Sequence, residues 1–392
     1  MSWPIRIISP AGPVPKIKWK TWRLSVLLIL FFIIFSGWFF RGMKIVDGDN
    51  FIKPILPWVI AAIGGYLIAL SIRVYYYGVC LSVYDSYEND AQSLREQWKE
   101  WASESVYIAA NHFFMPSRVS LSEIISGKTI DVANGQALKL DVLDKDFTEE
   151  DLFNELLSSV RAEIKKLSSS YVFDVIFTCE ENHTSFPLFR ECWRSMGVDE
   201  CVLGNCYFFK YDHEYIFQHV LNAKVNRIYI VVSIRVDSHQ LSFADTTEFA
   251  SILLMTKNNL DLDKVNGCVA MRPMSCIKNT IEDEFILLRT YQPEVLNTNR
   301  VFFSALEQQD IVLISDELRK PLSAEKKLWE FDVNDLNMVL GKLSDEHFWL
   351  VFALSLHFSE IRKEPSLMIH RVGEQVVFNM VKPFDFHKES VN

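Results

Sequence analysis

The chain has 392 residues, of which 49% are hydrophobic and 23% are charged, and this balance excludes both a disordered tail and a wholly membrane-embedded protein. Its 40 Lys and Arg residues against 50 Asp and Glu residues give a net charge of −10, which argues against a protein that mainly binds nucleic acid phosphates. The composition leaves room for about two globular domains and indicates no function by itself.

The charge is unevenly distributed along the chain. Residues 1–73 contain nine basic and two acidic side chains, so this segment carries +7 and the remainder carries −17. A basic segment followed by an acidic domain is typical of a soluble domain that is anchored in a membrane.

Two uncharged stretches, Leu24–Phe40 and Pro54–Ile72, are long enough to cross a bilayer. At 1.5 Å per residue they extend roughly 25–29 Å, close to the ~30 Å hydrocarbon core. A cleaved signal peptide is the alternative for the first stretch, but no small-residue cleavage site follows it, whereas Arg41 and Lys44 do. We therefore expect a transmembrane helical hairpin.

The Lys and Arg residues predict how this hairpin is oriented. Five precede the first stretch, three lie in the loop 41–53, and Arg73 directly follows the second stretch. Since positive residues gather on the cytoplasmic side, we expect both termini to be cytoplasmic, in a multi-pass protein of the bacterial inner membrane. Seven cysteines without regular spacing fit a reducing compartment.

This organisation predicts four segments. They are a basic cytoplasmic N-terminus (1–23), a transmembrane helical hairpin (24–72), a juxtamembrane helical linker (73–105) and a cytoplasmic α/β domain (106–392).

The linker contains the helical sequence Tyr87–Ser103, whose apolar face is formed by Ala91, Leu94, Trp98 and Trp101. This face is expected to dock on the domain or on the membrane surface.

The remainder of the chain alternates strand-like and helix-like segments. The predicted helices are 147–166, with Thr148 as a plausible N-cap, 189–196, 214–223 and 345–360. The predicted strands are 171–178, 227–236, 249–257, 266–272 and 311–314, with a closing hairpin at 366–382. Because Arg227–Val236 is almost continuously β-branched, it indicates a central strand covered on both faces. We predict a mixed α/β layered domain that could consist of two pseudo-equivalent halves.

The order of these segments resembles the thiolase-fold β-ketoacyl synthases. A helix leads into the strong strand of Asn222–Ser233, and the apolar strand Ala250–Met255 follows. A helix that begins at a glycine, Gly341–His357, precedes the final hairpin Leu367–Val381. The resemblance covers about residues 140–385 and rests on the pattern of segments rather than on a specific motif.

The resemblance implies an acyl-transfer site with a nucleophilic cysteine at the start of a helix and two histidines. Cys206 lies near the expected nucleophile position, but Asn205 and Tyr207–Phe209 are not the small residues that a tight turn requires. The His-Gly-Thr-Gly-Thr signature is absent, and the second histidine, expected after a late glycine, falls at Lys342 after Gly341. We therefore predict no catalytic residue and a fold that has lost its chemistry.

Other polar residues give weaker indications. Cys201 and Cys206 are expected to be buried thiols. Glu180–Thr184 and Asp237–His239 follow predicted strands, where α/β proteins place ligand residues, but no GxSxG, P-loop or GxGxxG sequence accompanies them. An exposed patch could be formed by some of Trp98, Trp101, Trp193, Trp329 and Trp349.

The histidines show no spacing typical of metal ligands, since no HExxH, CxxC or paired Cys/His pattern links them. We predict neither a metal nor a cofactor. The nine histidines are His112, His183, His213, His219, His239, His347, His357, His370 and His387.

Three functions remain open at this point. The main prediction is a non-enzymatic accessory or adaptor protein of the inner membrane, associated with a bacterial secretion apparatus such as type VI. The alternatives are a membrane-bound acyl-transfer enzyme of the ketosynthase type, with Cys206 as nucleophile, and a membrane immunity protein against a secreted toxin. The expected partners are the membrane and either another protein or a second copy of the chain, with no nucleic acid.

Overall fold

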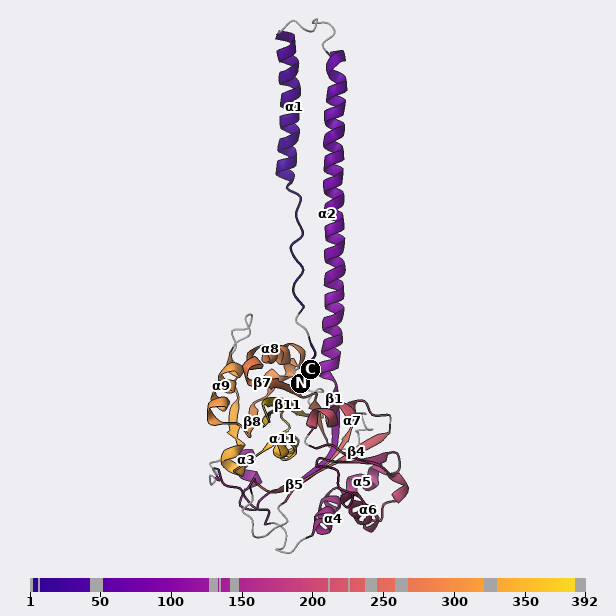
Figure 1. Ribbon diagram of the computed structural model, residues 1–392, viewed down its shortest axis with the longest axis vertical. Helices are drawn as coiled ribbons and strands as arrows, with labels where there is room; N and C mark the ends of the chain where they lie inside the picture. Colours follow the sequence, from indigo (N-terminus) through magenta and orange to yellow (C-terminus); the bar gives the residue numbers. More distant parts are fainter. Residues whose placement is uncertain are drawn as a thin grey trace. The chain divides into compact units, whose positions relative to one another are not determined.

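The structure is a computed structural model (Figure 1). It describes residues 3–5, 8–42, 52–126, 133, 135–141, 148–210, 212–224, 226–236, 245–257, 267–320 and 330–384. The chain divides into two compact units. We call Arg6–Gln97 the hairpin unit, and Met1–Ile5 together with Trp98–Asn392 the body.

The hairpin unit consists of an extended segment and two long helices, α1 (Trp19–Gly42) and α2 (Ile52–Ser103), of which the last turns of α2 belong to the body. Both helices are long and apolar enough to cross a membrane. They contact each other near the start of α1, where the rings of Trp22 and Tyr66 lie 5.6 Å apart. The Tyr66 hydroxyl donates a hydrogen bond to the carbonyl oxygen of Trp22 at 3.2 Å.

Helix α2 is much longer than a bilayer is thick. Its 52 residues correspond to roughly 78 Å at 1.5 Å per residue. The helix predicted for Tyr87–Ser103 is therefore the end of α2 and not a separate element. Of its predicted apolar face, Trp98 and Trp101 pack against the core of the body, whereas Leu94 is 44% exposed.

The body is built on one mixed sheet. Its first five strands are β1 (Ser105–Phe114), β2 (Val172–Phe177), β3 (Leu203–Phe208), β4 (Arg227–Arg235) and β5 (Phe249–Thr256). The later strands are β6 (Cys268–Met271), β7 (Met274–Ile277), β8 (Arg300–Ser304), β9 (Asp332–Asp335), β10 (Ser366–Val372) and β11 (Gln375–Pro383). Their order across the sheet is β3-β2-β4-β5-β1-β6-β11-β10-β8-β9, and β7 pairs with β11.

This order is a duplication. From the outer edge of the sheet to its centre, the strands of the first half stand in the order β3, β2, β4, β5 and β1. The second half has the same order from its own outer edge, β9, β8, β10, β11 and β6, so that these strands are the counterparts of β3, β2, β4, β5 and β1 respectively. Strand β2 is parallel to β3 and β4, as its counterpart β8 is to β9 and β10, while β5 and its counterpart β11 run antiparallel to their neighbours. The predicted α/β domain is thus present, with two halves of equivalent topology that meet where β1 pairs with β6.

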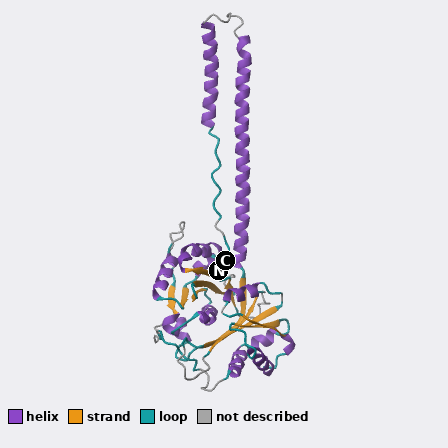
Figure 2. Cartoon of the chain, viewed as in Figure 1, coloured by secondary structure: helices purple, strands orange, loops and turns teal. Residues whose placement is uncertain are grey.

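Helices cover both halves of the sheet (Figure 2). Helices α4 (Glu149–Ser159), α5 (Arg161–Leu167) and α6 (Ser185–Ser195) pack with residues of β2, β4 and β5 in one apolar core. Helices α8 (Ile281–Tyr291) and α9 (Gln308–Arg319) pack with β8, β10 and β11 in a second core. The short helices α3 (Leu121–Ser126) and α10 (Leu336–Leu340) contribute to a third.

The third core joins the two halves. It contains α7 (His213–Leu221), α11 (Phe348–Arg362) and side chains from strands of both halves, such as Val231 of β4 and Met368 of β10. The first two turns of α11, Phe348–Leu354, are buried and apolar around their whole circumference, whereas Ile361 and Arg362 at its end are exposed.

The amino-terminal residues 3–5 pack into the body. Trp3 and Ile5 are buried in the core that contains α8 and α9. The indole nitrogen of Trp3 donates a hydrogen bond to the carbonyl oxygen of Pro273 at 2.9 Å. Its ring meets that of Trp101 edge-on at 5.7 Å, and the Arg272 guanidinium lies 4.1 Å from the Trp101 ring centroid.

Gly341 should be the least replaceable glycine among the described residues. Its φ is +77°, and a Cβ there would collide with the carbonyl oxygen of Gln136, which accepts a hydrogen bond from the Lys342 amide at 2.9 Å. Gly341→Ala should lower the free energy of unfolding by about 3 kcal/mol or more. Gly373→Ala is the control, because its φ of +57° is similar but nothing lies within 4 Å, and it should cost about 1–2 kcal/mol. Equal losses in urea denaturation would contradict this account.

Most predicted elements are present, and one is wrong. Thr148 caps α4 by accepting a hydrogen bond from the Asp151 amide at 3.3 Å, and β4 is buried in the sheet as predicted. The predicted strand at Ile311–Ile314 instead lies within α9. Ile311 and Ile314 share a helical face with Leu318 and are buried with it in the same core, whereas Val312 and Leu313 are exposed.

Candidate functional site

A serine and a histidine meet at the carboxyl end of two parallel strands in the second half. Ser304 ends β8, and His370 lies opposite it on β10 in the register of the pair. Register partners place their side chains on the same face of a sheet, so Ser304 Oγ lies 2.8 Å from His370 Nδ1. Both residues are fully buried.

The first half has a polar pair at the equivalent position. Thr178 directly follows β2, the counterpart of β8, and Ser233 lies on β4, the counterpart of β10. The Thr178 hydroxyl donates a hydrogen bond to Ser233 Oγ at 2.8 Å. The duplicated topology thus produces the same kind of contact twice, but only the second half contributes an imidazole.

Two further histidines stand at the starts of the central helices α7 and α11. His213 is the first residue of α7, and its ring stacks on Phe348, the first residue of α11, at 4.4 Å. The Phe348 ring meets His370 edge-on at 5.9 Å. His347 immediately precedes α11. The two central helices therefore bring their first residues to the pair on β8 and β10.

Hydrogen bonds fix the tautomer of His347. Its Nε2 lies 2.6 Å from the carbonyl oxygen of Thr247, which can only accept, so Nε2 carries the hydrogen. Its Nδ1 accepts a hydrogen bond from the Ser344 amide at 3.0 Å. His347 thus closes the turn that begins α11 and has no nitrogen left for a substrate.

Burial keeps these imidazoles neutral. Burial, reinforced by the nearby His347 and His213, lowers the pKa of His370 to about 3. Burial also lowers the pKa of His347. Among the described residues, His370 Nε2 has no hydrogen bond of good geometry, although the backbone of Asp345 and Ser344 lies close enough to oppose the lowering of its pKa. A buried polar atom without a partner is costly, so this nitrogen marks the pair as a candidate functional group.

The turn after Ser304 is strained. Ala305 has φ +54°, which is unfavourable for a residue with a Cβ. Asn337 holds the turn, because its Oδ1 accepts a hydrogen bond from the Ala305 amide at 2.8 Å and its Nδ2 donates one to the Leu306 carbonyl at 2.9 Å. Strained backbone at a strand-to-helix turn is frequent beside reactive residues.

The cysteine considered as nucleophile lies elsewhere. Cys206 is in the middle of β3, opposite Val175 of β2, and not at the start of α7. Burial raises the pKa of its thiol to about 12, so it is protonated at neutral pH. The start of α7 carries His213 instead. Cys206 therefore lacks both the position and the thiolate that nucleophilic catalysis requires.

The second histidine that the resemblance implies does not directly follow Gly341, and the next histidine along the chain, His347, lies six residues after this glycine. Lys342 follows Gly341 as the sequence shows, but α11 begins only at Phe348. The residue before this helix is His347, so a histidine does stand at its start. The resemblance did not point to His347, because it placed the start of this helix at Gly341.

The other predicted polar residues do not join this site. Cys201 is exposed, Glu180 forms an exposed ion pair with Lys210, and 237–239 lie outside the described residues. Trp193 and Trp349 are buried in the core and form no exposed patch, while Trp329 lies outside the described residues. Within the described part of the chain, no three His, Cys, Asp or Glu side chains are placed to hold a metal ion.

Comparisons with known proteins show similarity of fold and not of sequence. No protein-family model and no curated protein matches this sequence. Among solved structures, a variant of OleA from Xanthomonas campestris bound with cerulenin has a TM-score of 0.49 at 9% identity, covering 73% of this chain and 98% of that one.

Two further solved structures have similar scores. The 3-oxoacyl-(acyl carrier protein) synthase III FabH from Pseudomonas aeruginosa has a TM-score of 0.45 at 11% identity, with 71% and 98% of the two chains covered. AbyA1, a tetronic acid condensing enzyme, has a TM-score of 0.46 at 10% identity, with 70% and 99% covered. The predicted thiolase-like resemblance is confirmed as a likeness of fold.

The main functional prediction needs correction. A non-enzymatic adaptor is contradicted because the solved structures that match the body are condensing enzymes. The catalytic alternative of the sequence analysis fits them better, although its proposed nucleophile, Cys206, does not fit the structure. The protein partner and the link to a secretion apparatus stay predictions.

Proposed function

We propose that this protein is a membrane-bound acyl-transfer enzyme in which Ser304 replaces cysteine as the nucleophile. The observation that carries the proposal is the buried contact of 2.8 Å between Ser304 Oγ and His370 Nδ1. The ketosynthase resemblance implies a nucleophile and two histidines, of which the second half of the body supplies a nucleophile and one histidine, Ser304 and His370. His347 holds the turn before α11 and takes no part in the transfer.

The chemistry follows from the protonation state of His370. Its neutral ring holds one hydrogen, and with that hydrogen on Nε2 the Ser304 hydroxyl donates to Nδ1. Ser304 Oγ then attacks the carbonyl carbon of an acyl thioester while its proton passes to Nδ1. As the carbon–sulfur bond breaks, the proton passes to the leaving sulfur. The products are an ester on Ser304 and a free thiol, with no change in oxidation state.

The first experiment looks for this ester. The full-length protein in detergent is incubated with octanoyl coenzyme A, and its mass is measured before and after digestion. We expect the mass of one octanoyl group on the peptide that contains Ser304. A non-cleavable thioether analogue of the donor serves as the control. Failure to acylate Ser304 with any of a series of acyl chain lengths would contradict the proposal.

We also propose that the hairpin crosses the bacterial inner membrane and that both termini lie in the cytoplasm. The distribution of Lys and Arg supports this orientation. The burial of Trp3 in the body supports an even number of membrane crossings. Trp3 precedes α1, whereas nearly all the rest of the body follows the apolar part of α2, so the chain must return to the side of the membrane on which it started.

Protease treatment of spheroplasts tests this topology. We expect the body to resist digestion in intact spheroplasts and to be degraded after lysis, because the membrane protects cytoplasmic domains. A tag inserted in the loop 41–53 should be cleaved in both conditions. Digestion of the body in intact spheroplasts would place it outside the cell.

A further inference from the structure

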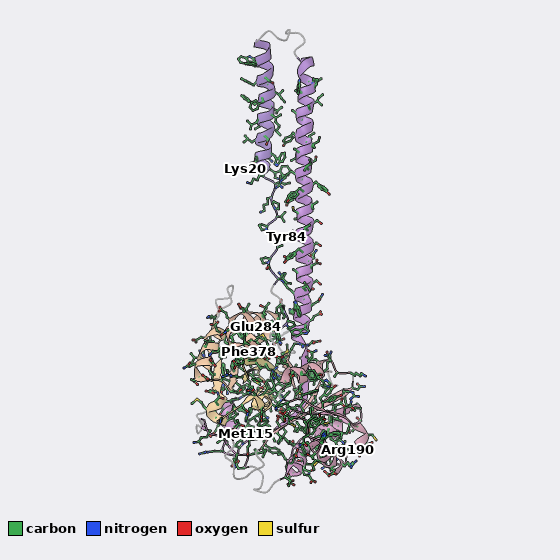
Figure 3. The ribbon with its side chains drawn as sticks, in the orientation of Figure 1. Lys20, Tyr84, Met115, Arg190, Glu284 and Phe378 are labelled. Atoms are coloured by element: carbon green, nitrogen blue, oxygen red, sulfur yellow. The ribbon has the colours of Figure 1, made fainter. Side chains whose placement is uncertain are left out.

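The hairpin unit carries a cluster of positive side chains at the amino-terminal end of α1. Lys16, Lys18, Lys20 and Arg23 fall within eight residues, and all four side chains are exposed. Lys20 stands at the start of α1 (Figure 3). The apolar part of α1 begins directly afterwards, at Leu24.

A fifth positive residue comes from α2. The Arg73 guanidinium donates hydrogen bonds to the carbonyl oxygens of Pro15 at 3.2 Å and Lys16 at 3.5 Å. These bonds bring the extended segment before α1 to the side of α2. We call Lys16, Lys18, Lys20, Arg23 and Arg73 the basic collar.

No acidic side chain of the hairpin unit is close in sequence to the collar. Between Arg6 and Tyr84 the acidic residues are Asp47 and Asp49, which belong to the loop at the opposite ends of α1 and α2. The next acidic residue after Arg73 is Asp85, twelve positions and roughly 18 Å further along the helix. Lys16, Lys18, Lys20 and Arg23 form no ion pair within the described part of the chain.

Aromatic residues place the collar at the depth of lipid headgroups. Trp22 and Tyr66 contact each other beside the collar, and such rings favour the boundary between hydrocarbon and headgroups. Arg73 lies seven residues beyond Tyr66, which is roughly 10 Å along the helix. Its long side chain can reach back towards the boundary.

We propose that the basic collar binds the phosphate of anionic phospholipids. This inference depends on the hairpin spanning a membrane and is independent of acyl transfer at Ser304. Lys side chains act as point charges, while Arg23 and Arg73 can hold two phosphate oxygens at once. An anionic lipid supplies both the phosphate and an acyl chain that follows the apolar surface of α1, whereas inorganic phosphate supplies only the charge.

Native mass spectrometry of the full-length protein in a neutral detergent tests this proposal. Phosphatidylglycerol and phosphatidylcholine with identical acyl chains are titrated separately, and bound lipids are counted. We expect about tenfold tighter binding of phosphatidylglycerol at about 50 mM salt and a smaller preference at about 500 mM, because salt screens exposed charges. Equal binding of the two lipids would overturn the proposal.

Variants with the same number of charges removed locate the site. Replacing Lys16, Lys18, Lys20 and Arg23 by glutamine should abolish the preference for phosphatidylglycerol. The control replaces four exposed cations of the body by glutamine: Lys99, Arg118, Lys165 and Lys224. The control should keep the full preference for phosphatidylglycerol. An equal loss of preference in both variants would show that only the overall charge matters, and it would overturn the assignment of lipid binding to the basic collar.

Inorganic phosphate distinguishes the two sources of phosphate. Adding it at about 10 mM, with chloride at equal ionic strength as the reference, should leave phosphatidylglycerol bound. Displacement by phosphate but not by chloride would assign the collar to free phosphate and overturn the lipid assignment.

Discussion

Replacing Ser304 by alanine is expected to abolish transfer of an acyl group from a thioester to the body. The change removes the oxygen that attacks the carbonyl and leaves His370 without the hydroxyl that contacts Nδ1. The acylation rate should fall by about 10³-fold or more, as is typical when a nucleophile is removed. The octanoyl coenzyme A assay with mass detection measures this rate, and an unchanged rate would exclude Ser304 as nucleophile.

The duplicated fold offers a matched control for this variant. Ser233→Ala makes the same chemical change at the equivalent place in the first half, where Ser233 contacts Thr178. It should cost about 1 kcal/mol of stability through a lost hydrogen bond and leave acylation intact. Cys206→Ala should also leave acylation intact. His370→Asn should slow acylation by about 10²–10⁴-fold because the group that accepts the proton is lost.

Stability should fall steeply as the pH drops below about 6.5. In the folded body the pKa of His370 is about 3, whereas an unfolded histidine has a pKa of about 6.5. The unfolded chain therefore binds more protons between these values, and stability present at neutral pH is lost as the pH falls through the unfolded pKa. His370 alone should remove about 2 kcal/mol at pH 5, and His347, whose pKa is also lowered by burial, adds to the loss.

Urea denaturation between pH 7.5 and pH 5 measures this dependence. Carboxylates with lowered pKa values lose their contribution only at more acidic pH, so histidines dominate in this range. His370→Asn should flatten the curve, because asparagine does not titrate. His183→Asn is the control, since His183 is exposed, and it should leave the slope unchanged. Equal slopes for His370→Asn and the parent protein would contradict a buried neutral imidazole.

The sequence predicted the elements of the site better than the site itself. The strand with His370 and the helix after His347 follow from local patterns of apolar residues. Strand β8, which ends at Ser304, was not predicted, because Arg300–Ser304 is short and has no distinctive turn before it. The pairing of β8 with β10 joins residues 66 positions apart, and no local signal in one sequence indicates such a pairing.

The misplaced nucleophile has a similar cause. The resemblance placed Cys206 near the nucleophile position, which that family has at the start of a helix, and no strand was predicted around it. In the structure β3 continues to Phe208 and α7 starts at His213, so the cysteine remains inside the sheet. The start of α7 was predicted to within one residue, but β3 was not predicted, so nothing in the local pattern showed that Cys206 lies inside the sheet.

The repeated strand order has a consequence for how such a protein can evolve. Two polar contacts of the same kind exist at corresponding places, and a fold that contains each place twice can alter one copy while the other preserves the architecture. In this chain the two copies differ, because only the second contains a histidine. Placing an imidazole at Ser233 and a hydroxyl at His370 would test whether the first half can support the acyl transfer proposed for the second.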